Sequence, residues 1–111
     1  MIVEVDETNY QEMIEEEFSK GKIVVLQFTS PYCDACMAME FELEELDDEM
    51  QDISILAIDC ANSEALAQDY DIIEVPTIKI YKDAQTLIFD GVGVVLAADI
   101  KEIIQESCRD L

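Results

Sequence analysis

The sequence predicts an α/β protein whose mixed central sheet of five strands is flanked by four helices on both faces. Four segments carry apolar residues at helical spacing, and two short runs are continuously apolar, as in strands covered on both sides. Two further segments alternate in polarity around a short turn and predict a hairpin. The order β-α-β-α-β-α-β-β-α therefore calls for parallel strands first and an antiparallel pair last, in one domain over residues 1–111.

The first half of the chain is expected to form a short strand over 1–5, a helix that ends at Gly21, and a buried strand over 23–29. Glycine ends helices because it adopts a left-handed backbone without strain. The run 23–29 is apolar at nearly every position, which is typical of a strand inside a parallel sheet. Glu15 to Glu17 are expected on the solvent side of the first helix. The apolar faces of this helix and of the helix that leaves from Cys36 comprise Tyr10, Met13, Ile14 and Phe18, and Met39, Leu43, Leu46 and Met50.

The second half of the chain is expected to add a buried strand, a short helix, a hairpin and a final helix. Period-two alternation on both sides of a short turn predicts the hairpin. Gly91 and Gly93 are expected to interrupt its second strand. The final helix follows from an apolar stripe at helical spacing. The expected strands are 53–58, 77–82 and 86–89, and the inward residues of the two helices are Leu66, Ala67 and Tyr70, and Ile100, Ile103, Ile104, Cys108 and Leu111.

The chain is strongly acidic, with 27 acidic and six basic residues and a formal net charge of −21. This charge repels nucleic acid and anionic membrane surfaces, and it favours a monomer. It is compatible with a highly solvated surface, with partners that have basic docking surfaces, and with life at high internal salt. The sequence has no apolar run near the length of a membrane span and no hydrophobic leader, so a cytoplasmic location is expected.

Two of the four cysteines, Cys33 and Cys36, are three residues apart where a strand joins a helix. Helical spacing brings such side chains to one face, so they can form a disulfide with little backbone movement. The start of a helix also favours a thiolate through its free N–H groups and partial positive charge. This pattern predicts a redox site, with a structural pair or half of a zinc or iron–sulfur site as alternatives. Cys60 and Cys108 are expected to be buried thiols.

Several motifs together resemble thioredoxin, and the resemblance covers nearly the whole chain. They are Ser30-Pro31-Tyr32-Cys33-x-x-Cys36, Ile58-Asp59, Val75-Pro76-Thr77 and the late glycines. The resemblance implies the thioredoxin fold and a thiol-disulfide oxidoreductase with Cys33 as exposed nucleophile and Cys36 as buried resolving thiol. It also implies that Pro76 is a cis-proline and that the backbone of Val75 pairs with the substrate like an added strand.

The resemblance also assigns roles around the cysteines and implies the partners. Tyr32 occupies the place where the family usually has tryptophan, and Gly93 or Gly91 the place of a glycine that lines the docking groove. The implied partners are a thioredoxin reductase-type electron donor and disulfide-containing proteins. The disulfide itself is the expected redox group, because three glycines are too few for a nucleotide-binding loop and no metal is implied.

Two departures from the family pattern concern the chemistry. Asp34-Ala35 replaces the usual Gly-Pro between the cysteines, and the Asp34 carboxylate opposes formation of a thiolate on Cys33. We therefore expect a reducing potential, in or below the thioredoxin range. Gln27 replaces a buried aspartate that accepts a proton near the resolving thiol, and an amide cannot accept one at neutral pH. An alternative function is that of a binding or assembly protein of the same fold with little turnover.

Overall fold

Nine helices and strands follow one another in the predicted order within residues 2–108, the part of the chain that the computed structural model describes. Most lie within a few residues of their expected positions. They are β1 (Ile2–Val5), α1 (Tyr10–Ser19), β2 (Ile23–Thr29), α2 (Asp34–Glu49), β3 (Ile53–Asp59), α3 (Glu64–Asp69), β4 (Thr77–Asp83), β5 (Thr86–Val92) and α4 (Ala97–Ser107).

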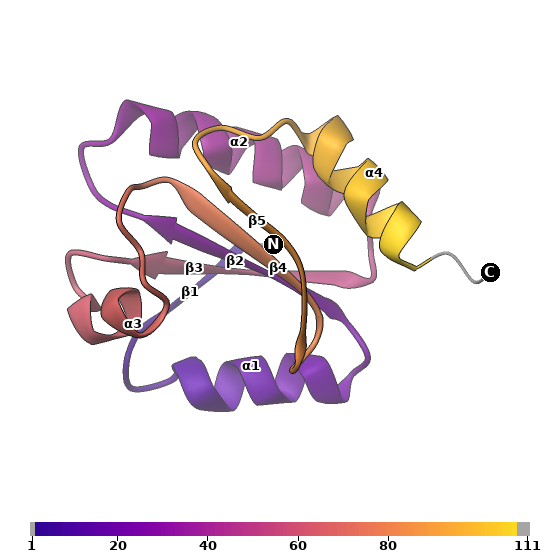
Figure 1. Ribbon diagram of the computed structural model, residues 1–111, viewed down its shortest axis with the longest axis horizontal. Coiled ribbons are helices and arrows are strands. Elements are labelled where there is room, and N and C mark those ends of the chain that lie inside the picture. Colours follow the sequence, from indigo (N-terminus) through magenta and orange to yellow (C-terminus); the bar gives the residue numbers. More distant parts are fainter. Residues whose placement is uncertain (1, 109–111) are drawn as a thin grey trace.

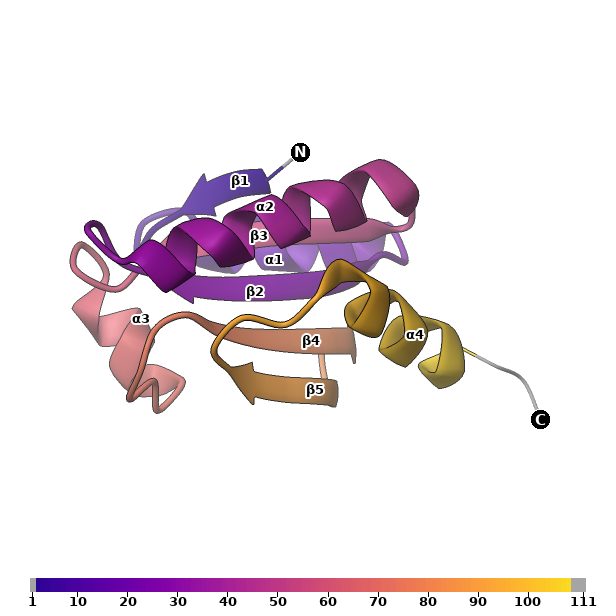
Figure 2. The same cartoon turned by 90° about the horizontal axis from the view of Figure 1, so that it is seen from above.

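The five strands form one twisted sheet in the order β1-β3-β2-β4-β5 (Figure 1). β3 pairs in parallel with both β1 and β2, whereas β4 runs antiparallel to β2 and to β5. This arrangement confirms the predicted mixed sheet with a terminal hairpin. Figures 1 and 2 show α2 and α4 on one face of the sheet, with α1 and α3 on the other.

Each face of the sheet supports its own hydrophobic cluster, because successive side chains of a strand point to opposite sides. In β2, Val25 packs beneath α2 and α4, whereas Val24, Leu26 and Phe28 pack toward α1 and α3. The cluster on the α2 side comprises Ile23, Val25, Met39, Leu43, Leu46, Ile53, Ile55, Ile78, Ile80, Ala97, Ile100 and Ile104. The cluster on the α1 side comprises Val5, Ile14, Val24, Leu26, Phe28, Leu56, Ile58 and Leu66.

Three expectations about individual residues are wrong. Glu17 is buried, because it turns toward the sheet and accepts a hydrogen bond of 2.8 Å from the Ser54 hydroxyl. Gly91 lies inside β5, where it pairs with Ile78, so the strand continues to Val92. Cys108 is exposed, because it caps the end of α4 instead of lying on its buried stripe. The expected positions of Met1 and Leu111 lie outside the described residues.

In the region 2–108, no helix combines the length and the apolar character needed to cross a membrane.

Candidate redox site

The first turn of α2 positions the two central cysteines. Cys33 caps the helix with an extended backbone, and its carbonyl accepts a hydrogen bond of 3.2 Å from the N–H of Met37. Its Sγ accepts the N–H of Cys36 at 3.2 Å. A sulfur that accepts an N–H at a helix start is stabilised as an anion by both the hydrogen bond and the helix dipole. The local fold therefore favours the reactive form of Cys33 in the reduced protein.

The sulfurs of Cys33 and Cys36 form a disulfide, with their Cα atoms 5.2 Å apart. The two residues differ in access to solvent: Cys36 is 3% exposed, whereas Cys33 is half-buried. A molecule in solution therefore meets Cys33 more readily than Cys36. The geometry thus divides the pair into an outer thiol and an inner thiol.

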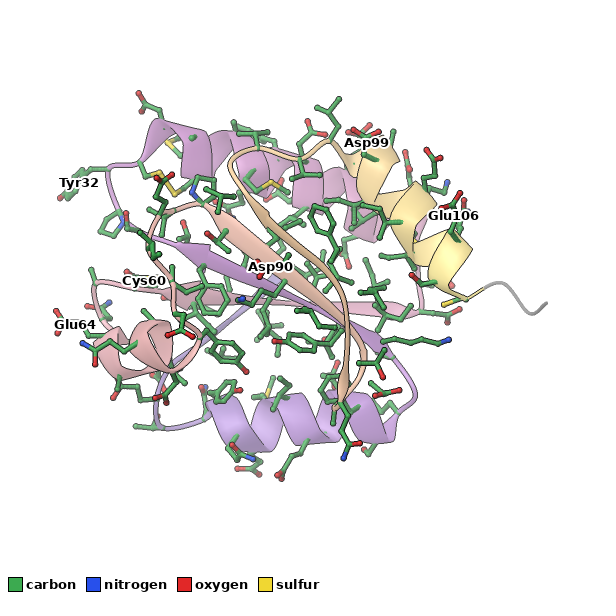
Figure 3. All side chains as sticks on the ribbon, viewed as in Figure 1. Tyr32, Cys60, Glu64, Asp90, Asp99 and Glu106 are labelled. Atoms are coloured by element: carbon green, nitrogen blue, oxygen red, sulfur yellow. A yellow bond between two sulfur atoms is a disulfide. The ribbon has the colours of Figure 1, made fainter. Side chains whose placement is uncertain are left out.

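Tyr32 precedes the pair and extends away from the protein. Its side chain is fully exposed, and Figure 3 shows it projecting outward beside the disulfide. The backbone of Tyr32 has a φ of 62°, a left-handed conformation that bulky residues seldom adopt. Asp34 and Ala35 are also exposed at the start of α2, and Met37 in the next turn is 58% exposed. These side chains form the outer surface around Cys33.

The loop that enters β4 lies at the same end of the molecule as the start of α2, as Figures 1 and 2 both show. Its Val75–Pro76 peptide bond is cis, and Pro76 is buried while Val75 is half-buried. The carbonyl of Pro76 accepts a hydrogen bond of 2.8 Å from the N–H of Gly93, whose φ is 91°. Glycine adopts this left-handed conformation without strain. The hydrogen bond from Gly93 therefore holds the end of the hairpin against the segment that contains the cis bond.

Sequence reasoning did not single out Ile73, a further apolar residue of the same loop. Its side chain is 92% exposed, and it is located two residues before Val75. Val92 and Val94 on either side of Gly93 are also largely exposed. The available signal was the pair Ile72-Ile73 in the short segment between α3 and β4, because one of two adjacent apolar residues outside a helix or strand is often left exposed. Exposed large apolar residues mark contact surfaces.

The remaining residues of interest lie away from the surface around Cys33. Gln27 is 2% exposed and is located in β2 on the side that faces α2. Cys60 follows β3, is half-buried, and donates its backbone N–H to the Thr29 carbonyl at 2.8 Å. Burial and the nearby Asp59 carboxylate raise the pKa of the Cys60 thiol. Among the described residues, no three His, Cys, Asp or Glu side chains are placed to hold a metal ion.

Comparison with known proteins decides the family. The thioredoxin family model matches residues 1–106. The chain belongs to the thioredoxin family. The disulfide at the start of α2 and the cis bond before β4 are thus found in a thioredoxin-family chain, as the sequence motifs predicted.

Individual relatives agree with this assignment. Thioredoxin F of rice chloroplasts is 34% identical over 76% of this chain, and the chain spans 43% of that protein. Thioredoxin of Bacillus subtilis is 35% identical over 64% of this chain and 68% of its own length. The crystal structure of spinach chloroplast thioredoxin F superposes with a TM-score of 0.82 at 27% identity, covering 97% of this chain and 94% of the other. These comparisons confirm the predicted fold.

Proposed function

We propose that this thioredoxin-family chain is a thiol-disulfide oxidoreductase that reduces disulfide bonds in proteins. The observation that carries the proposal is the unequal burial of two bonded sulfurs at a helix start, with Cys33 half-buried and Cys36 3% exposed. Membership of the family supports the same activity. A purely structural disulfide needs no such difference in burial between its two cysteines.

The reaction proceeds by two thiol-disulfide exchanges. The Cys33 thiolate attacks one sulfur of the substrate disulfide, forms a mixed disulfide and releases the other substrate sulfur as a thiolate. Cys36, as a thiolate, then attacks the Cys33 sulfur and releases the second substrate sulfur. Two electrons pass from the protein dithiol to the substrate, and the protein ends in its Cys33–Cys36 disulfide form.

Proton transfer to and from Cys36 distinguishes this chain from the family pattern. The side chain of Gln27 can donate or accept a hydrogen bond, but it cannot take up a proton at neutral pH. The Cys36 proton therefore passes to water or to the departing substrate thiolate. The Asp34 carboxylate offsets much of the stabilisation that the helix start gives to the Cys33 thiolate, so we expect the dithiol to be a good reductant. Without a proton acceptor at position 27, we expect the second exchange to be slow.

Substrate binding is assigned to the loop around the cis bond. The backbone of Val75 would pair with an extended segment of the substrate, and Gly93 would leave room for that segment to approach. Tyr32, Ile73 and Val92, all exposed, supply apolar contact around it. A separate reductase of the thioredoxin reductase type would return electrons to the disulfide. The cytoplasmic location and the monomeric state stay predictions.

Reduction of insulin by dithiothreitol, followed by turbidity, tests the proposed function. Wild-type protein should accelerate the reaction, and Cys33→Ser should lower the rate to that of dithiothreitol alone, because the attacking sulfur is lost. Cys108→Ser is the matched control, since it removes an exposed cysteine outside the site. A wild-type rate no better than that of Cys33→Ser would instead favour the alternative of a binding or assembly protein with little turnover.

A further inference from the structure

A large acidic cleft lies between α2 and the half of the sheet that contains β1, β3 and β2. Its volume is about 620 Å³, within the range of pockets that bind drug-sized ligands. Its lining residues come from both sides of this space and from the segment that leads to the redox site. They are Ile2, Glu4, Gln27, Thr29, Ser30, Pro31, Glu40, Glu44, Asp47, Asp48, Ala57 and Asp59.

The cleft exists because the hydrophobic cluster beneath α2 stops before the end of the strands. Val25 and Ile55 belong to that cluster, but the next residues on the same face are Gln27 and Ala57. Ala57 lies between Glu4 of β1 and Gln27 of β2 in the sheet register, so three adjacent strands present a small side chain flanked by two polar ones. The methyl group of Ala57 cannot fill the space below the helix.

Gln27 lies in β2 at the floor of this cleft. The residue is 2% exposed and lines the cleft, and its side chain makes no hydrogen bond to any residue of the described chain. The Gln27 amide therefore faces the solvent of the cleft, where it can donate a hydrogen bond to a polar ligand and accept one from it.

The charge of the lining selects the kind of ligand. Six of the lining residues are acidic, and none of those in the described region is basic. Glu40, Glu44 and Asp48 follow one another every four residues along α2, a spacing at which like charges repel. A cation relieves this repulsion. The carboxylates are spread along the cleft, and no three within the described range could hold one metal ion, so an extended ligand fits better than a metal.

The cleft also adjoins the redox site. Ser30 and Pro31 line it, and Cys33 follows Pro31 by two residues, which places their Cα atoms at most about 7 Å apart. A polypeptide whose disulfide reaches Cys33 can therefore place a neighbouring side chain in the cleft. The acidic lining would meet lysine or arginine there, because their N–H groups donate to carboxylates.

We propose that this cleft binds lysine or arginine side chains of the polypeptide whose disulfide is reduced at Cys33. The inference rests on the proposed function and specifies its substrate class: disulfides close to basic residues. Ammonium and guanidinium groups would donate hydrogen bonds to Glu40 and Glu44 and to the amide oxygen of Gln27. The same arrangement disfavours substrates with acidic residues next to the disulfide, because like charges in a confined space repel strongly.

Two disulfide peptides of the same sequence test the proposal, one with lysines beside the disulfide and one with acetyllysines in their place. The measured quantity is the second-order rate constant for oxidation of the reduced protein by each peptide. Wild-type protein should favour the lysine peptide by about tenfold or more at low salt. The preference should shrink as salt is raised, because salt screens the exposed carboxylates of the cleft.

Two double variants separate the cleft from the overall charge of the protein. Glu40→Gln/Glu44→Gln neutralises two exposed glutamates of the cleft that are four residues apart on α2. Glu102→Gln/Glu106→Gln neutralises two exposed glutamates with the same spacing on α4. The first should reduce the lysine preference to about twofold or less, and the second should leave it nearly unchanged. Equal effects of the two variants would overturn the proposal.

The outcomes distinguish this inference from the proposed function. If both peptides are reduced rapidly at the same rate, the cleft assignment is wrong and the oxidoreductase stands; if neither is reduced, the proposed function fails. The side-chain amide signal of Gln27 in an NMR titration of the oxidised protein locates the binding. Its saturable shift by the lysine peptide supports the proposal. A shift by spermine or Ca²⁺ with none by the lysine peptide contradicts it.

Discussion

The two sides of the sheet differ most where β2 and β3 end. On the α1 side this end is filled by Phe28, whose ring packs against Tyr70 with centroids 5.3 Å apart. Tyr10 meets Tyr70 edge-on at 6.0 Å, and the two hydroxyls share a hydrogen bond. On the α2 side the neighbouring residue, Gln27, opens into the acidic cleft. Adjacent residues of β2 thus have different surroundings: Phe28 is packed in a hydrophobic cluster, and Gln27 lines a cleft.

The carboxylates on the two sides of the sheet also differ in their partners. Glu17, on the α1 side, accepts hydrogen bonds from Ser54 and Lys20 and also lies 3.8 Å from the ammonium of Lys22. The lysine and serine partners lower the pKa of Glu17, the Lys20 hydrogen bond having the largest effect. Among the described residues that line the cleft there is no lysine or arginine to do the same. The buried carboxylate Glu17 is thus compensated by partners within the protein, whereas Glu40, Glu44 and Asp48 of the cleft are exposed to solvent.

Truncating the filled side should have the largest effect on stability. Phe28→Ala removes a fully buried ring that contacts Tyr70 and should lower the free energy of unfolding by about 3 to 5 kcal/mol. Urea unfolding followed by circular dichroism measures the change. A loss of less than about 1 kcal/mol would mean that this end of the α1 side is as loosely filled as the cleft.

Removing the charge of Glu17 should have an intermediate effect that depends on pH. Because its pKa in the folded protein lies below the ordinary value of 4.5, its stabilisation is complete well above that pH and disappears as the pH falls through the folded value. Glu17→Gln should therefore cost roughly 1 to 2 kcal/mol at pH 7, and the difference from wild type should narrow below about pH 4.5. A constant difference over this pH range would show that the charge of Glu17 contributes nothing.

Replacing Gln27 should have the smallest effect of the three. Gln27→Leu exchanges an amide that has no hydrogen-bond partner among residues 2–108 for an apolar side chain, so the free energy of unfolding should stay within about 1 kcal/mol of wild type or rise. The same unfolding experiment applies. A loss of 2 kcal/mol or more would indicate that the Gln27 amide is bonded in the folded protein, which would remove one support of the proposed cleft ligand.

Much of the fold follows from short-range patterns in the sequence. Continuous runs of apolar residues predicted β2 and β3, and alternation of apolar and polar residues predicted β4. Helical spacing predicted that Met39, Leu43 and Leu46 lie on the buried face of α2. These patterns work because the side chain's direction is set by the backbone period, whatever the rest of the chain does. The spacing of Cys33 and Cys36 likewise sufficed to predict a pair at the start of a helix.

Features that depend on distant residues were not predictable in this way. The sequence around Glu17 predicts a surface glutamate. Its burial depends on Ser54 of β3, which is distant in the sequence and donates a hydrogen bond to it. The cleft requires Glu4 and Gln27 to flank Ala57 in the sheet. The register of the three strands cannot be predicted from the sequence of any one of them. Cys108 fits the apolar stripe of α4 by spacing, but the helix ends at Ser107 and leaves it exposed.

The division between an outer and an inner thiol is the central claim, and trapping the mixed disulfide tests it most directly. Reduced Cys36→Ser and reduced Cys33→Ser are each mixed with a disulfide peptide, and adducts are counted by mass spectrometry. Cys36→Ser should accumulate a stable adduct at Cys33, because the residue that would release the peptide is absent. Cys33→Ser should form little adduct at Cys36, which is 3% exposed. Equal adduct formation by the two variants, or adducts only at Cys36, would contradict the account.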